Sequence, residues 1–294
     1  HTTSAFVYDS VVPLLVLQQP NALFEPTPLS ILSGTASDPG TLGLRAELST
    51  VQVSIQINPP TGNYWKGGSF GPGETYLGVT SGLDTWTTIS TPVWVSGSVY
   101  RVRARAVDNA DNVSALGDQQ FTFDSNNPTT AITLPMNNNP QNTPAASPAT
   151  VSGTASDNTE LDSVWVRIYN SVLTQYWDNA AQTYNAIAAE YSWYISSATL
   201  ANWTVWRATF TVASGTTYRV EAKARDKSGN YDNTYSTRTF LYDTGLPRSW
   251  VNAPANNSYI SSLATITGTS SDTGGSNVNA VYVAIRRNTD NQWW

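Results

Sequence analysis

The stretch Ser214-Gly-Thr-Thr-Tyr-Arg-Val-Glu-Ala-Lys-Ala-Arg-Asp226 decides the fold of this chain. From Tyr218 onward, apolar or small side chains alternate with charged ones, which is the pattern of a β-strand with one buried and one exposed face. The same pattern occurs 118 residues earlier, in Ser96-Gly-Ser-Val-Tyr-Arg-Val-Arg-Ala-Arg-Ala-Val-Asp108. The chain therefore contains a repeat.

Two further markers recur with nearly the same period. Phe-x-aromatic-Asp begins at Phe6, Phe121 and Phe240, and Gly-Thr-x-Ser-Asp begins at Gly34, Gly153 and Gly268. Their spacings are 115 or 119 residues, which suits one β-sandwich of about 100 residues with an insertion. We therefore predict an all-β chain of tandem immunoglobulin-like β-sandwich domains.

The phase of the markers predicts where these domains begin and end. Residues 1–9 are expected to form the last strand of a preceding domain, and residues 10–124 and 125–243 two complete domains. Residues 244–294 are expected to hold the first strands of an incomplete third domain. A piece of a longer repeat protein would have this phase. So would an assembly in which the strand around Phe6 of one copy completes the open domain of the next.

Alternating strands are also expected at 51–57, 164–168 and 281–285, and residues 180–190 are the one stretch compatible with a short helix. The composition excludes several classes of site. There is no cysteine, the only histidine is His1, and the net charge is −6. Cys or His nucleophiles, zinc sites and disulfides are thus excluded from the body of the chain, and nucleic acid is not expected as a partner. No run of apolar residues reaches the length of a membrane span, and we predict no enzymatic activity.

The two quoted segments, with the turns Asn109-Ala-Asp-Asn112 and Lys227-Ser-Gly-Asn230 that follow them, resemble a known class of repeat. They are similar to the E-to-F corner and F strand of bacterial immunoglobulin-like and fibronectin type III-like tandem repeats. The resemblance covers essentially the whole chain as repeats. It implies an extracellular or cell-surface module of a large adhesin, surface layer, appendage or secreted enzyme, and it implies no reaction. The first turn has Asp111-Asn112 in place of Gly-Asn, which leaves its type open.

Tyr100 and Tyr218 occupy the position of a tyrosine corner, in which a hydroxyl near the start of strand F bonds to backbone upstream. We assign them a structural role.

Calcium is the one cofactor that the sequence suggests. The loops after strands B and F lie at the end of the sandwich where the chain enters, so acidic residues of three markers should converge there. In the first domain they are Asp9, Asp38, Asp108 and Asp111, and in the second Asp124, Asp157, Asp226 and Asn230. Carboxylate and carbonyl oxygens are the ligands of Ca²⁺. The alternative is that these residues only cap turns.

Aromatic residues form the second candidate site. They lie just past strand C and in the insertions: Tyr64, Trp65, Trp86, Tyr176, Trp177, Trp193, Trp203 and Trp206. They can pack the core, anchor contacts between copies, or stack on sugar rings.

The function that these observations favour is structural. We expect an extracellular repeat protein that forms a filament, a sheath or an adhesin stalk by stacking or strand-sharing, with other copies of itself as partners. The alternatives are a module that binds carbohydrate or a surface, and a non-catalytic spacer of a secreted enzyme.

Overall fold

The computed structural model describes residues 8–40, 45–138, 149–200 and 202–294. The predicted strand around Phe6 therefore lies outside the described residues. Within them the chain is all-β except for one turn of 3-10 helix, Ala189–Tyr191, so the predicted fold class is confirmed. No helix in the described ranges has the length and apolar character needed to cross a membrane.

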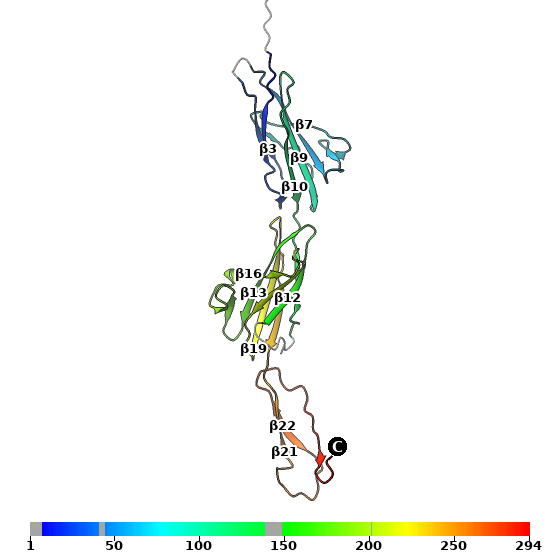
Figure 1. Cartoon of the computed structure of the whole chain (residues 1–294), viewed down its shortest axis with the longest axis vertical. Coiled ribbons are helices and arrows are strands. Elements are labelled where there is room, and N and C mark those ends of the chain that lie inside the picture. The colour runs from blue at the N-terminus through cyan, green and yellow to red at the C-terminus, as the bar shows by residue number, and fades with distance from the viewer. Residues whose placement is uncertain (1–7, 41–44, 139–148, 201) are drawn as a thin grey trace, which may run out of the picture. The chain divides into compact units, whose positions relative to one another are not determined.

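The chain divides into two compact units, and Figure 1 labels strands of both. Unit 1 holds the chain up to Pro128 together with two later loops, Asp157–Glu160 and Asp226–Tyr231. Unit 2 holds Thr129–Ser156, Leu161–Arg225 and Asp232–Trp294. Two loops of the second repeat thus belong to the same compact unit as the first repeat.

Unit 1 contains a sandwich of two sheets. One has the order β1-β3-β8 and the other β2-β10-β9-β4-β5-β6, with β7 paired to β4. The first sheet consists of β1 (Leu14–Gln19), β3 (Leu32–Ser37) and β8 (Thr85–Thr88). The second consists of β2 (Phe24–Glu25), β4 (Leu48–Ile57), β5 (Tyr64–Trp65), β6 (Phe70–Gly71), β7 (Leu77–Gly78), β9 (Ser98–Asp108) and β10 (Gly117–Phe123). In an immunoglobulin-like sandwich, strands A, B and E lie in one sheet and strands C, F and G in the other. Here β1, β3 and β8 take the places of A, B and E, and β4, β9 and β10 those of C, F and G.

Unit 2 repeats this arrangement. One sheet has the order β11-β12-β18-β17, and the other β15-β14-β13-β19-β20 with β16 on β13. The first sheet consists of β11 (Thr129–Leu134), β12 (Ala149–Ser156), β17 (Ser197–Ala198) and β18 (Val205–Phe210). The second consists of β13 (Leu161–Asn170), β14 (Gln175–Asp178), β15 (Thr183–Asn185), β16 (Tyr194–Ile195), β19 (Thr216–Asp226) and β20 (Ser236–Tyr242).

The suggestion of a helix over residues 180–190 is wrong. The Asp178 side chain accepts hydrogen bonds from the backbone amides of Ala180 and Ala181, at 3.0 and 3.1 Å, and this closes a turn. The chain after the turn forms β15, which pairs antiparallel with β14. Only the 3-10 turn near the end of this stretch is helical.

The third repeat forms two separate ribbons in unit 2. β21 (Arg248–Ala253) pairs with β22 (Thr267–Ser271), and β23 (Arg286–Arg287) pairs with β24 (Gln292–Trp293). The segment 281–285, predicted as a strand, is not assigned to one. In the first two repeats the equivalent strands β4 and β13 pair with β9 and β19.

The central strands β9 and β19 alternate strictly between buried and partly exposed residues. On β9 the inward side chains are Tyr100, Val102, Ala104 and Ala106, each with 0% of its surface exposed. On β19 the equivalent side chains are also fully buried: Tyr218, Val220, Ala222 and Ala224. Each strand lies between two neighbours in its sheet, so its inner face forms the middle of the core.

The Gly-Thr-x-Ser-Asp marker has a packing role in both sandwiches. Gly34 on β3 lies opposite Trp86 on β8, and Gly153 on β12 lies opposite Trp206 on β18. A Cβ atom at either glycine would lie 2.4 Å from the tryptophan ring and 2.1 Å from a backbone carbonyl oxygen of the neighbouring strand. The absent side chain is what lets the indole approach the strand so closely. Both tryptophans are fully buried.

The tyrosines at the start of the central strands bond to backbone upstream. The Tyr100 hydroxyl accepts a hydrogen bond from the Val95 amide at 2.8 Å, and the Tyr218 hydroxyl accepts one from the Ala213 amide at 2.9 Å. This is the geometry of a tyrosine corner.

One core position differs in charge between the two sandwiches. In the first, the Ser114 hydroxyl accepts a hydrogen bond from the Ala106 amide at 2.9 Å. In the second, the Asp232 carboxylate accepts the equivalent bond from Ala224 at 3.0 Å. Burial raises the pKa of Asp232 to about 6, and hydrogen bonds from the Ala224 and Thr130 backbone offset only part of the effect.

We expect Asp232→Ser to stabilise the chain at pH 7.5. The folded state holds the Asp232 proton more tightly than the unfolded chain, so wild-type stability falls as the pH rises from about 4 to 6. The substitution should remove a loss on the order of 1–3 kcal/mol. Urea unfolding at pH 4.5 and 7.5 measures it. The reciprocal Ser114→Asp should introduce a similar loss of stability at pH 7.5. If the pH dependence of stability were unchanged in both variants, its assignment to Asp232 would be refuted.

Candidate functional site

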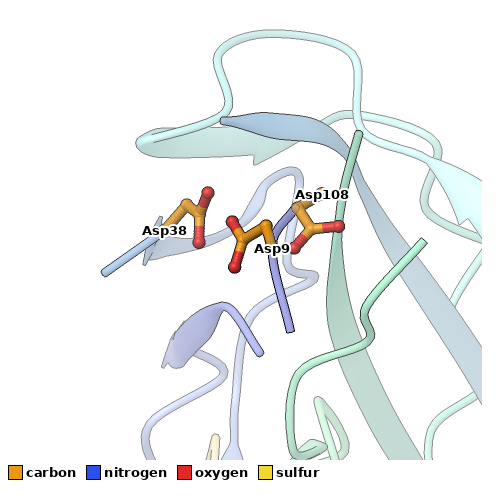
Figure 2. Close-up of side chains that lie close together, drawn as sticks. All are labelled: Asp9, Asp38 and Asp108. Carbon is orange, nitrogen blue, oxygen red and sulfur yellow. The ribbon is translucent and has the colours of Figure 1, made fainter. Parts of the chain in front are cut away.

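Three carboxylates meet at one end of the first sandwich, and we call Asp9, Asp38 and Asp108 the first carboxylate cluster. One oxygen from each lies within 4.8 Å of the other two. Figure 2 shows the Asp9 side chain between those of Asp38 and Asp108. Asp38 directly follows β3, Asp108 ends β9, and Asp9 precedes β1. The Asp9 carboxylate also accepts the backbone amides of Val11 and Ala46, at 2.9 and 2.7 Å.

Asp38 is the unusual member of this cluster. Its side chain is 4% exposed, and neither carboxylate oxygen accepts a hydrogen bond of normal geometry from any described residue. Burial raises the pKa of Asp38, and the charges of Asp9 and Asp108 raise it further, although the nearby Glu47 backbone amide offsets part of this shift. A buried carboxylate without partners is costly, because it loses hydration and gains nothing in exchange.

Asp108 is fully buried but well provided with donors. Its side chain accepts hydrogen bonds from the amides of Ala110 and Asn112, at 2.8 and 2.9 Å. The Asn112 side-chain amide donates to Asp108 at 2.8 Å and to the Asp9 backbone carbonyl at 3.1 Å. Asn112 thus joins the loop after β9 to the chain segment that enters the sandwich.

The structure does not bring Asp111 into the cluster. Asp111 is exposed, has a φ of 68°, and occupies the turn position that Gly229 fills in the second repeat with a φ of 97°. Asn112 is the residue equivalent to Asn230. Aligning the two turns on Asp108 and Asp226 would have identified it.

The second carboxylate cluster consists of Asp124, Asp157 and Asp226, whose nearest oxygens also lie within 4.8 Å of one another. All three belong to unit 1. Asp124 and Asp226 are fully buried. The Asn230 side-chain amide donates to Asp226 and to the Asp124 backbone carbonyl, at 2.8 and 2.9 Å. This repeats the role of Asn112.

Thr159 makes the second cluster different from the first. Its hydroxyl lies within hydrogen-bond distance of Asp124, and at 2.8 Å from Asp157. A hydroxyl has one hydrogen and cannot donate to both carboxylates at once. The other Asp157 oxygen is buried and has no partner among the described residues. In the first repeat the residue at the position of Thr159 is Gly40, which has no hydroxyl to offer.

Hydrogen bonds and burial oppose each other in this cluster. Burial alone would raise the pKa of Asp124, but hydrogen bonds from Thr159, Ser96 and neighbouring groups outweigh it and the pKa is lowered. Burial raises the pKa of Asp226, which the hydrogen bonds from Asn230 only partly offset. The sequence did not indicate Thr159 or Ser96, because hydroxyl residues are common throughout the chain.

The same marker positions also approach each other in the third repeat. Asp243 accepts hydrogen bonds from the amides of Gly245 and Ser276, at 2.7 and 3.1 Å. The Ser276 hydroxyl donates to Asp272 at 3.0 Å, and the other Asp272 oxygen is buried and without a partner in the described chain. In every repeat, therefore, the aspartate of the Gly-Thr-x-Ser-Asp marker has at least one side-chain oxygen without a partner in the described chain.

The oxygen atoms of these clusters are ligands suited to a hard divalent cation. Three carboxylates with additional backbone carbonyl oxygens nearby are the ligand types of Ca²⁺, which takes about six to eight oxygens at 2.3–2.6 Å. One oxygen of Asp38 lies within 4.8 Å of an oxygen of each other carboxylate, and neither Asp38 oxygen accepts a hydrogen bond of normal geometry from the described residues. Of the two clusters, the first therefore has the carboxylate set that fits a cation better.

The predicted aromatic site divides into two groups. Trp86, Trp177 and Trp206 have at most 1% of their surface exposed, so for them external contact is excluded and packing is their role. The others are partly buried: Tyr64, Trp65, Tyr176, Trp193 and Trp203. The Arg167 guanidinium carbon lies 4.6 Å and the Lys223 Nζ 4.5 Å from the Trp193 ring centroid, so two cations of its own chain lie over this ring.

No protein-family model and no curated protein matches this sequence. Similar solved structures include a tetra-tandem repeat in the extending region of a large adhesion protein, with 16% identity, a TM-score of 0.35, and 93% of this chain and 67% of that chain covered. The fibronectin(III)-like modules of Clostridium thermocellum CbhA match with 12% identity and a TM-score of 0.33, over 78% and 94% of the two chains. The D00-D0 domain of intimin matches with 15% identity and a TM-score of 0.30, over 78% and 100%. The structural neighbours are thus immunoglobulin-like and fibronectin type III-like modules. Their TM-scores are low, and any functional conclusion depends on this chain's own residues.

We expect Asp38→Asn to stabilise the chain when a chelator is present at pH 7.5. The amide removes a buried charge and can donate to Asp9 and Asp108, which should add about 1–3 kcal/mol to the free energy of unfolding. The gain should shrink as the pH falls to about 4 and below, where Asp38 becomes protonated in both states. Urea unfolding at both pH values measures it, with Asp111→Asn as the matched control. A variant that is less stable than wild type in chelator would show that Asp38 is not strained by its neighbours.

Proposed function

We propose that this chain is an extracellular structural repeat protein of adhesin type, whose immunoglobulin-like sandwiches are held at their entry segments by bound Ca²⁺. Asp9 and Asp124 belong to the segments that enter the first and second sandwich. The other carboxylates of each cluster lie at the ends of two strands of that sandwich. A cation shared by them restrains the entering segment.

The observation that carries this proposal is the buried Asp38 carboxylate, which accepts no hydrogen bond of normal geometry from the described residues and lies close to two more carboxylates. A group that served only to cap a turn would accept local backbone amides, as Asp178 does with Ala180 and Ala181. Asp38 does not. The second cluster, with the same marker positions, supports the same interpretation.

A calcium-dependent site of this kind also supports the extracellular location. Extracellular modules bind Ca²⁺ with dissociation constants of about 10⁻⁴–10⁻³ M, and we propose that these clusters work in that range. A stalk within one surface protein is the form that we favour over a filament or sheath, because the three carboxylates of each cluster already converge and need none from a second copy. The sugar-binding alternative has less support, since the largest tryptophans are in the core and Trp193 is covered by cations.

Calcium titration followed by thermal melting tests the proposal. Ca²⁺ should raise the stability of the wild-type chain by about 2.7 kcal/mol at a concentration one hundred times the dissociation constant. It should also slow proteolysis of segments 8–13 and 124–128. Asp38→Asn should lose the effect of the first cluster, and Asp157→Asn that of the second.

Asp111→Asn serves as the control for these variants. Its side chain is exposed and outside the cluster, and asparagine tolerates the positive φ at this position, so it should respond to Ca²⁺ like the wild type. Since Asp38→Asn is expected to be the more stable chain in chelator, the two melting temperatures should approach or cross as Ca²⁺ is added. Equal melting temperatures of the wild type with Ca²⁺ and with chelator would end the calcium proposal.

A further inference from the structure

Two cations and two aromatic rings meet on the outer face of the second sandwich. Arg167 and Lys223 are outward-facing residues of β13 and β19, and Trp193 directly precedes β16, which pairs with β13. The Arg167 guanidinium carbon and the Lys223 Nζ, which lie over the Trp193 ring, are 5.5 and 5.9 Å from the Tyr235 ring centroid. The two rings pack edge to face, with their centroids 4.9 Å apart. We call these four side chains the cation–aromatic cluster.

Positive charge is in excess in this cluster. The carboxylate of Glu221 forms an ion pair with Arg167 and lies 3.8 Å from the Arg219 Nε, so two arginines share it. The Arg167 and Glu221 side chains are only 14% and 13% exposed. Burial lowers the pKa of Lys223, and the charge of Arg167 lowers it further. Like charges that are partly removed from water repel each other, and an added anion would relieve that cost.

The fold itself does not require the cation–aromatic cluster. In the first sandwich, Ser54 stands at the position of Arg167, and Arg105 stands at the position of Lys223. Arg105 lies over the Tyr76 ring, with its guanidinium carbon 3.9 Å from the ring centroid. The same two strands thus pair there without a cation at the position of Arg167. The paired cations are therefore a property of the second repeat, and packing of the sheet gives no reason for them.

We propose that the cation–aromatic cluster binds an acidic polysaccharide through the carboxylates of its uronic acid units. Lys223 and Arg167 pair with one carboxylate, and the sugar ring that carries it lies against Tyr235, which is 46% exposed. A carboxylate suits two neighbouring cations, because charge-assisted hydrogen bonds to it are stronger than those to a neutral hydroxyl. This ligand goes beyond the structural function proposed above, and its source outside the cell rests on the extracellular location proposed there.

The spacing of charges favours a uronic acid polymer over other polyanions. Double-stranded DNA carries one phosphate per about 1.7 Å of its axis, and a chain with a net charge of −6 would repel it. A uronic acid polymer has one carboxylate per sugar, with the uncharged faces of the sugar rings between them. That pattern matches a local pair of cations beside an exposed aromatic ring on an acidic chain. The cations over Trp193 oppose stacking of a neutral sugar there, but they supply donors to an acidic one.

Binding of polygalacturonate to the whole chain tests the proposal, with the fully methyl-esterified polymer as the matched probe. Esterification removes the charge and keeps the sugar, so only the acid should bind saturably. A chelator is present throughout, because Ca²⁺ would otherwise bridge carboxylates of the polymer and of the protein. Biolayer interferometry at low salt measures the affinity, and added salt should weaken it by screening the charges.

Substitutions of Lys223 test whether the cluster is the site. Lys223→Gln should bind polygalacturonate about tenfold more weakly, the scale of one lost hydrogen bond between charged groups. Lys223→Arg keeps the charge and should bind like the wild type. Lys66→Gln is the matched control, because it removes the same charge from an exposed lysine of the first repeat and should leave the affinity unchanged. Urea unfolding of the three variants checks that each is folded.

Any one of several results would overturn the proposal. Equal binding of the acid and its methyl ester would remove the carboxylate from recognition, and wild-type affinity in Lys223→Gln would remove the cluster. Binding of dextran sulfate as tight as that of polygalacturonate would reassign the face to polyanions of any kind. A lack of saturable binding would exclude the site. Because these measurements are made in chelator and change neither carboxylate cluster, their failure would leave the calcium proposal untouched.

Discussion

A single strand with a side-chain period of two connects the two ends of each sandwich, and the rest of the structure depends on it. In β9 the buried residues run from Tyr100 to Asp108 in steps of two, with no exposed surface at either. The tyrosine corner fixes the start of the strand, and the residue at its end, Asp108, belongs to the carboxylate cluster. A shift of register by one residue would turn both groups outward and the charged residues inward. The core and the candidate metal site therefore both depend on the same alternation.

That alternation is also why much of the fold could be predicted from the sequence. The period-two pattern of residues 100–106 and 218–224 specifies a half-buried strand, and three recurring markers specify the repeat. The convergence of Asp9, Asp38 and Asp108 then follows from which loops share one end of a sandwich. Trp86 and Trp206 were harder to interpret, because a buried and an exposed tryptophan look alike in sequence. Their burial depends on Gly34 and Gly153, which lie opposite them only once the strands are paired.

The parts that could not be predicted depend on single side chains at loop positions. Asn112 joins Asp108 to the distant Asp9, and Thr159 joins Asp157 to the distant Asp124. Asn112 can be found only by aligning the two turns, and no pattern in the sequence indicates Thr159. The stretch 180–190 was compatible with a helix by composition, but one carboxylate, that of Asp178, closes a turn and sends the chain back as β15. Asp111 was included with the acidic residues, although its place in the turn is that of a glycine with positive φ. For these loop residues, the residue type indicated the kind of site, and the backbone conformation decided which side chains reach it.

The two carboxylate clusters meet the same physical problem in different ways. The first leaves both oxygens of the buried Asp38 without a hydrogen bond of normal geometry from the described residues. In the second, Thr159 brings a hydroxyl to Asp124 and Asp157, where the first repeat has Gly40. Because a buried charge without partners reduces stability, such a cluster favours whatever completes it. A cation that satisfies the site is then held by the free energy that the unsatisfied state had cost.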